Sequence, residues 1–122
     1  MSPRDFDALV EECMDIIPPR FRSRLRNLLF VVEPEPREPG LLGLYEGRPL
    51  TERSVGESYS APDRITIYQG PHERLARNAS ELRKLVEETI WHEVAHYFGL
   101  DEREVLRAER RRRTRLRRLR EL

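Results

Sequence analysis

The sequence of 122 residues has little of several features that would define other classes of protein. Cys13 is its one cysteine, which excludes an intramolecular disulfide and any metal cluster built on cysteine. No stretch approaches the ~18 apolar residues of a membrane-spanning helix, and the mean hydropathy of −0.73 is typical of a soluble protein. The N-terminal residues show no apolar stretch behind a basic start, so we expect no signal peptide and a cytoplasmic location.

The net charge of +1 hides an uneven distribution of charge. Residues 1–102 carry 13 basic and 19 acidic side chains, a net charge of −6, whereas residues 103–122 carry 10 basic and 3 acidic ones, a net charge of +7. The length is that of a single domain. We therefore predict one domain over residues 1–106 and a basic helical tail over residues 107–122.

Local patterns predict a small α+β domain. Ser2 and Pro3 are suited to begin a helix, and Pro18-Pro19 to end it. One apolar stripe runs along this predicted amphipathic helix, and it consists of Phe6, Leu9, Val10, Cys13 and Ile17.

Three segments are expected to be strands. Residues 28–32 form a short apolar run typical of a buried strand, and residues 41–47 can form a short strand inside a long Pro-rich loop. Residues 64–69 alternate around two isoleucines, and Gly70-Pro71 should close that strand.

A long helix follows these strands. Asn78 and Glu81 have the spacing of a capping box, and Gly99 predicts a left-handed C-terminal cap after about Phe98. A last helix should begin at Asp101 and continue through the Arg-rich tail.

Two histidines and a glutamate form the clearest chemical motif. The segment His92-Glu93-Val94-Ala95-His96 has the spacing H-E-x-x-H on the predicted long helix. Side chains four residues apart lie on the same face of a helix, so both imidazoles can bind one metal ion. Glu93 is near enough to act as a general base toward a water there, and imidazole ligands favour zinc.

The alternative is that His92 and His96 are hydrogen-bonded core histidines and that Glu93 is a solvated acid. The predicted helix is apolar around these residues, and buried polar groups are costly unless they are paired or bind a ligand. Three such side chains together therefore favour the metal site.

A catalytic zinc site needs a third protein ligand and an open fourth position. Gly99 lets the chain turn sharply after His96, so a residue just beyond it can fold back toward the metal. We prefer Glu102 as the third ligand. Asp101 is the alternative, although its spacing to Glu104 also suits a helix cap.

The segment 92–103 resembles the H-E-x-x-H-x-x-G-x-x-D motif of the small zincin-like metallopeptidases, a bacterial family of minimal proteins. The strand at 64–69, the segment around Tyr45 and the short chain are similar too. The resemblance covers most of residues 1–106 and implies a zincin-like α+β core with peptidase activity. Glu102 stands where the usual motif has aspartate, and no methionine follows the motif, so the Met-turn of the wider metzincin group is absent.

The resemblance also implies residue roles. His92, His96 and Glu102 would bind Zn²⁺, and Glu93 would be the catalytic base. Zincins pair extended peptide substrates with a strand near the cleft, so 64–69 is the expected substrate-binding strand. Four residues could donate to an oxyanion, although a structural role is preferred for each and none is assigned: Tyr45, Tyr68, Tyr97 and His72.

The Arg-rich tail has nine arginines between Arg107 and Arg120 and no aromatic side chain. The simplest interpretation is a solvated helix that docks on the acidic body or aids solubility. The alternative is an arm that contacts an acidic partner, or nucleic acid without sequence specificity. Two functions therefore remain: a zinc-dependent peptidase acting on peptides or proteins, or a non-catalytic binding or regulatory protein with a vestigial or structural metal site and a tail that makes the main contact.

Overall fold

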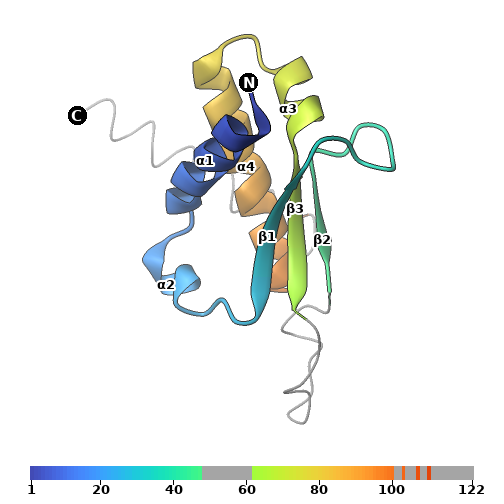
Figure 1. Cartoon of the computed structure of the whole chain (residues 1–122). Helices are drawn as coiled ribbons and strands as arrows, with labels where there is room; N and C mark the ends of the chain where they lie inside the picture. The colour runs from blue at the N-terminus through green and yellow to red at the C-terminus, as the bar shows by residue number, and fades with distance from the viewer. Residues whose placement is uncertain (48–61, 101–102, 104–106, 108–109, 111–122) are drawn as a thin grey trace, which may run out of the picture.

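The computed structural model describes residues 1–47 and 62–100 and the positions Arg103, Arg107 and Arg110. Within this part the chain is an α+β domain, as predicted, with a three-stranded sheet that packs on helices α1 and α4 (Figure 1). The core lies between these two layers. Its fully buried apolar side chains include Phe6, Ile17, Ile65, Ile67, Val86, Ile90 and Val94.

Helix α1 (Pro3–Cys13) confirms the predicted amphipathic N-terminal helix. The hydroxyl of Ser2 accepts a hydrogen bond from the backbone N–H of Asp5 at 3.1 Å, which satisfies one of the unpaired donors at the helix start. A 3₁₀ turn (Met14–Ile16) and the short helix α2 (Pro19–Arg22) then lead away from α1. The buried stripe continues to Ile17, so the apolar pattern extends beyond the regular helix.

The sheet has the strand order β1-β3-β2. Strand β1 (Leu28–Glu33) runs parallel to β3 (Asp63–Tyr68), and β2 (Gly43–Glu46) runs antiparallel to β3. The expectation that residues 64–69 form a substrate-binding edge is therefore wrong, because β3 is hydrogen-bonded on both sides. Strand β1, expected to be buried, is half-buried because it lies at one edge of the sheet.

Helix α3 (Gln69–Leu75) was not expected, because Gly70-Pro71 reads as the end of a strand. Strand β3 does end at Tyr68, but the next residues begin a helix at once. Proline is tolerated in a first helical turn because the N–H that it lacks has no partner inside the helix.

Helix α4 (Ala79–Tyr97) is the predicted long helix, and both of its caps form. The Asn78 side chain accepts from the N–H of Glu81 at 2.9 Å. At the other end Gly99 has φ of 81°, and the N–H groups of Gly99 and Leu100 donate to the carbonyls of His96 and Ala95. This pair of bonds is a Schellman motif, in which glycine takes the left-handed position without steric cost.

The predicted last helix and the domain boundary near residue 106 lie mostly outside the described residues. Arg103, Arg107 and Arg110 are helical and exposed. Among the helices in the described part of the chain, none is both long enough and apolar enough to cross a membrane.

Candidate active site

The two histidines of the H-E-x-x-H motif lie side by side on α4. The ring centroids of His92 and His96 are 4.9 Å apart, with an angle of 59° between the ring planes. Both side chains are half-buried, so the rings are neither enclosed in the core nor fully solvated. Two imidazoles at this separation on one helical face can reach a single metal ion.

Glu93 lies between α4 and strand β2. Its side chain is 9% exposed. A cavity of about 340 Å³ opens beside it, and Glu93, His92 and Thr89 line the α4 side of that cavity. The opposite wall comes from the chain that leads into β2, namely Gly40, Leu41, Leu42 and Gly43. His92 and Glu93 therefore face a cavity that is closed on one side by an edge of the sheet, and His96 lies one helical turn further along α4.

Gly43 sets how closely β2 approaches this part of α4. A Cβ atom added there would lie 2.7 Å from Cγ2 of Thr89 and 3.2 Å from Cγ of Glu93. A glycine inside a strand often marks such a close approach of two elements. The sequence contained this signal, but the partner that approaches Gly43 could be identified only from the structure.

Neither candidate for a third metal ligand is among the residues that the structure describes. Both Glu102 and Asp101 lie outside them, and the described part contains no group of three His, Cys, Asp or Glu side chains that could hold a metal. The Schellman motif at Gly99 ends the helix directly after His96 and turns the chain there. The two imidazoles fit zinc chemically, and the choice of Glu102 stays a prediction.

Comparison with known protein families shows to which family the chain belongs. The family model described as "zincin-like metallopeptidase" matches residues 25–112. The chain belongs to this family. Among solved structures, it is similar to a conserved hypothetical protein from Thermus thermophilus, with 27% sequence identity and a TM-score of 0.54 over 80% of this chain and 94% of that one. No curated protein matches the chain significantly.

The family match covers the sheet and α4, including the zincin-like motif, but it leaves out both ends of the chain. Helix α1 and residues 113–122 lie outside the matched range. The side chains that face the candidate active site therefore all lie within the matched range.

His72 lies behind this zincin-like site and is fully buried. Its Nδ1 is 2.6 Å from the carbonyl oxygen of Tyr68, and its Nε2 is 2.8 Å from the hydroxyl of Thr89. A carbonyl can only accept, so Nδ1 carries a proton and donates it to Tyr68. The single proton of the Thr89 hydroxyl has two acceptors within reach, Nε2 of His72 and the carbonyl oxygen of Leu85 at 2.9 Å. Burial lowers the pKa of His72 below its usual 6.5, which favours the neutral form. His72 therefore supports α4 from behind.

Two of the three tyrosines considered as oxyanion donors make structural hydrogen bonds, and the third lies on the far face of the sheet. The Tyr97 hydroxyl accepts from the N–H of Arg26 at 2.9 Å and donates to the Arg26 carbonyl at 3.0 Å. The Tyr45 hydroxyl donates to a carboxylate oxygen of Asp63 at 2.6 Å. Tyr68 lies with Glu33 and Arg64 on the sheet face opposite the core, since it alternates with the buried Ile67.

His72 should make folding stability dependent on pH. Its pKa is lower in the folded than in the unfolded chain, so the unfolded chain binds more protons as the pH falls below about 6.5. The free energy of unfolding should therefore fall from that pH downward, toward the folded-state pKa. Urea unfolding of metal-free protein between about pH 8 and 5 measures this, and a His72→Gln variant should lack this component. Equal pH slopes in the two proteins would show that His72 is not the cause.

Proposed function

We propose that this zincin-like protein is a zinc-dependent peptidase. The observation that carries the proposal is the joint position of His92, His96 and Glu93. Two adjacent imidazoles and a buried carboxylate lie on one helix, next to a cavity that ends at a sheet edge. Membership of the zincin-like metallopeptidase family supports the same class of reaction.

The residues divide into ligands and a base. His92, His96 and Glu102 would hold the metal, with two nitrogen donors and one oxygen donor. Bound zinc would polarise the substrate carbonyl and lower the pKa of its water to about 7. Glu93 accepts the proton of the attacking water and then gives it to the leaving amide nitrogen. The partly closed site limits the number of solvent waters near Glu93.

Strand β2 is the better candidate for binding the substrate backbone. One side of β2 is paired with β3, and within the described residues no strand pairs with its other side. β2 also begins at the wall of the cavity that His92 and Glu93 line. An extended peptide added to this edge would pass in front of the zincin motif, and its backbone would gain ladder hydrogen bonds.

Metal removal tests the proposal. Purified protein should cleave members of a mixed peptide library, detected as new termini by mass spectrometry. A zinc chelator should abolish cleavage, and added zinc in excess over the chelator should restore it. A chelator-resistant activity would point to a contaminating protease or to a different mechanism. No cleavage by zinc-loaded protein of any library member would contradict the proposed activity.

A further inference from the structure

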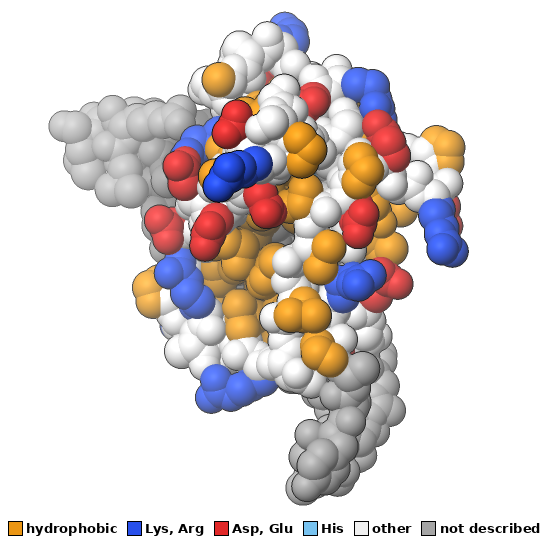
Figure 2. All heavy atoms as spheres, in the orientation of Figure 1, with side chains coloured by type: hydrophobic (Ala, Val, Ile, Leu, Met, Phe, Trp, Pro, Cys, Tyr) orange, Lys and Arg blue, Asp and Glu red, His pale blue; other side chains and the backbone are white. Residues whose placement is uncertain are grey.

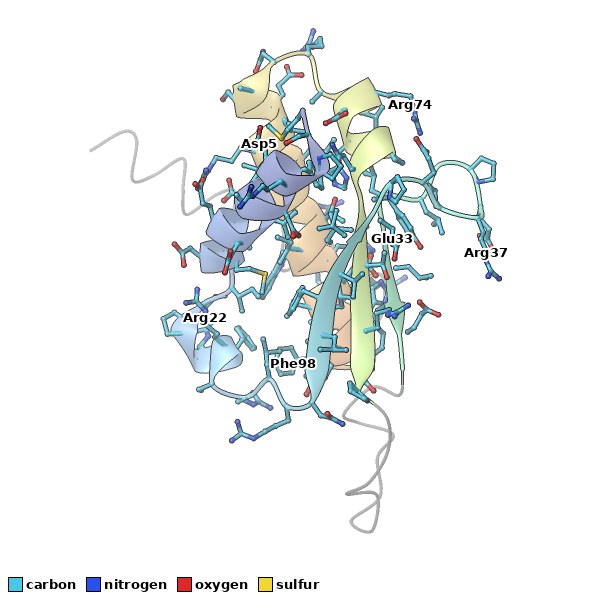
Figure 3. All side chains as sticks on the ribbon, viewed as in Figure 1. Asp5, Arg22, Glu33, Arg37, Arg74 and Phe98 are labelled. Atoms are coloured by element: carbon cyan, nitrogen blue, oxygen red, sulfur yellow. The ribbon has the colours of Figure 1, made fainter. Side chains whose placement is uncertain are left out.

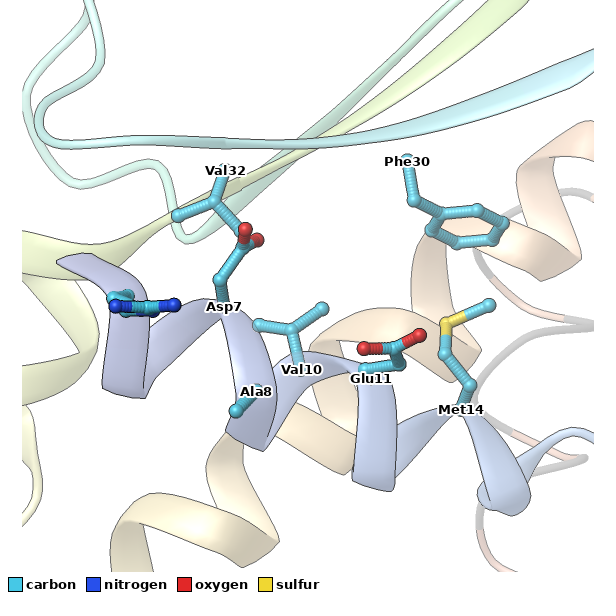
Figure 4. Close-up of a pocket in the computed structure, with 8 residues that line it drawn as sticks. Asp7, Ala8, Val10, Glu11, Met14, Phe30 and Val32 are labelled. Atoms are coloured by element: carbon cyan, nitrogen blue, oxygen red, sulfur yellow. The ribbon is translucent and has the colours of Figure 1, made fainter.

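A second cavity lies at the opposite edge of the sheet, between helix α1 and strand β1. Its volume is about 430 Å³. Apolar side chains form its floor, namely Val10, Met14, Phe30 and Val32 (Figure 4). Two acidic side chains and one basic side chain stand on its α1 side: Asp7, Glu11 and Arg4. In Figure 2 the same region is a hollow with apolar side chains inside and both acidic and basic side chains beside it. We call it the α1–β1 groove.

The acids of the α1–β1 groove lack the partners that neighbouring acids have. Glu12 forms an ion pair with Arg83 at 2.9 Å, and Asp15 lies 3.5 Å from Arg22. Asp7 and Glu11 are four residues apart on α1 and exposed, and no ion pair within the described residues involves either of them. Two carboxylates on one helical face repel each other, and with Arg4 as the single basic side chain of the groove the face keeps a net negative charge, so a cationic ligand at this position would be favoured.

The groove also borders an open sheet edge. Strand β1 is paired only with β3 within the described part, and residues 28–32 carry no charge. Leu29 is 51% exposed. Natural proteins usually protect such an edge with charges, a proline or a covering segment. Only Glu33, at the end of β1, and the Pro34 that follows it provide this protection, so a covering segment is the physical alternative over residues 28–32.

We infer that the C-terminal Arg-rich segment of the same chain, residues 111–122, docks in the α1–β1 groove. This segment carries seven arginines and one glutamate, which complements the acids on α1. It also carries Leu116, Leu119 and Leu122, which can contact the apolar floor.

The chain leaves α4 near the start of β1, the strand that forms one wall of the groove. Phe98 follows α4 and packs on Phe21, with 5.3 Å between ring centroids, and Tyr97 is hydrogen-bonded to Arg26 just before β1. Figure 3 shows Phe98 beside the lower end of β1. The 22 residues after Leu100 can span about 33 Å as a helix or about 70 Å when extended, which is enough to cross a domain of this size.

A spin label in the tail tests the docking in the full-length chain. Glu121→Cys would carry the nitroxide, because native Cys13 is 1% exposed and burial raises its pKa to about 11, which makes it unreactive. In NMR spectra of the labelled protein, the nitroxide broadens the signals of nearby nuclei, so the methyl signals of Val10, Met14 and Val32 should lose intensity several-fold. Leu42 and Leu85, at the cavity beside the motif, should lose much less.

Charge reversal supplies the matched controls. Asp7→Lys with Glu11→Lys should abolish the selective loss of methyl intensity. Adding Arg115→Glu, Arg117→Glu and Arg118→Glu in the tail should restore it. The control pair Glu38→Lys and Glu46→Lys makes the same change in net charge on the opposite side of the sheet and should leave the effect unchanged. About 1 M salt should weaken the effect.

Three results would overturn the inference. Uniform or absent broadening in the labelled wild type would mean that the tail does not dock in the groove, whether or not it binds RNA. Selective broadening that persists after the charge reversal would show that Asp7 and Glu11 do not bind the tail. Broadening that occurs only when spin-labelled chains are mixed with isotope-labelled ones would assign the groove to a second copy of the chain.

Discussion

Glu93→Gln is expected to reduce the rate of peptide cleavage by about 10²–10⁴-fold while the protein keeps its zinc. Glutamine has nearly the same size and can occupy the same position between α4 and β2. It cannot accept a proton from water at neutral pH, so the proton transfer that Glu93 would perform is lost. Zinc content should be unchanged, because the proposed ligands are His92, His96 and Glu102.

The matched control for this variant is Glu88→Gln. Glu88 is on the same helix and lines the same cavity, but it lies one helical turn before His92. The same loss of charge should therefore change the cleavage rate far less. A Glu93→Gln protein that contains zinc and cleaves peptides like the wild type would exclude Glu93 as the base. A similar loss in both variants would indicate a general effect of charge in the cavity.

Gly43→Val should damage both the fold and the activity. Besides the contacts with Thr89 and Glu93, a Cβ at this position would lie 3.2 Å from the backbone oxygen of Thr66 in β3. That oxygen belongs to the central strand and cannot easily move, so β2 must shift away from α4. Overpacking of this kind costs about 1–3 kcal/mol in the free energy of unfolding. The displaced strand would also no longer present its edge to the site, so cleavage should fall.

Leu44→Val is the control for Gly43→Val. Leu44 is the next residue in β2, and its side chain lies on the outer face of the sheet with Arg64 and Tyr68. Urea unfolding and peptide cleavage should both stay close to wild type in this variant. A Gly43→Val protein with unchanged stability and activity would mean that the close approach of β2 and α4 is not needed.

Local signals predicted the helices because each signal acts within one turn of chain. The side chains of Ser2 and Asn78 cap the two helices that they were expected to cap, and Gly99 ends α4 as expected. Helix α3 was missed for the same reason: Gly70 and Pro71 are local breakers, and their place in a first turn depends on packing around buried His72.

Strand pairing could not be predicted because it joins distant residues. Strand β3 has the most regular alternation, and it is the central strand because both β1 and β2 pair with it. The sequence does not contain that order. The choice of 64–69 as the substrate-binding edge failed on this point, and β2 takes its place as the proposed edge.

The candidate site likewise contains features that the local sequence predicts and features that depend on strand pairing. His92 and His96 lie together because a helix brings residues four apart to one face, which the sequence specifies directly. The position of Gly43 against Thr89 and Glu93 depends on β2 pairing with β3, and so could not be predicted. Glu102 was chosen from spacing beyond a glycine turn, and its role depends on how the chain continues after Leu100.

Zinc content, measured by mass spectrometry on purified protein, tests most directly whether this is a metal-dependent enzyme. About one zinc ion per chain is expected in the wild type, with loss in His96→Ala and weaker binding in Glu102→Ala. The control Asp101→Ala should keep its zinc if Glu102 is the third ligand. A wild-type protein that binds no metal even after incubation with zinc would contradict the peptidase assignment at its foundation.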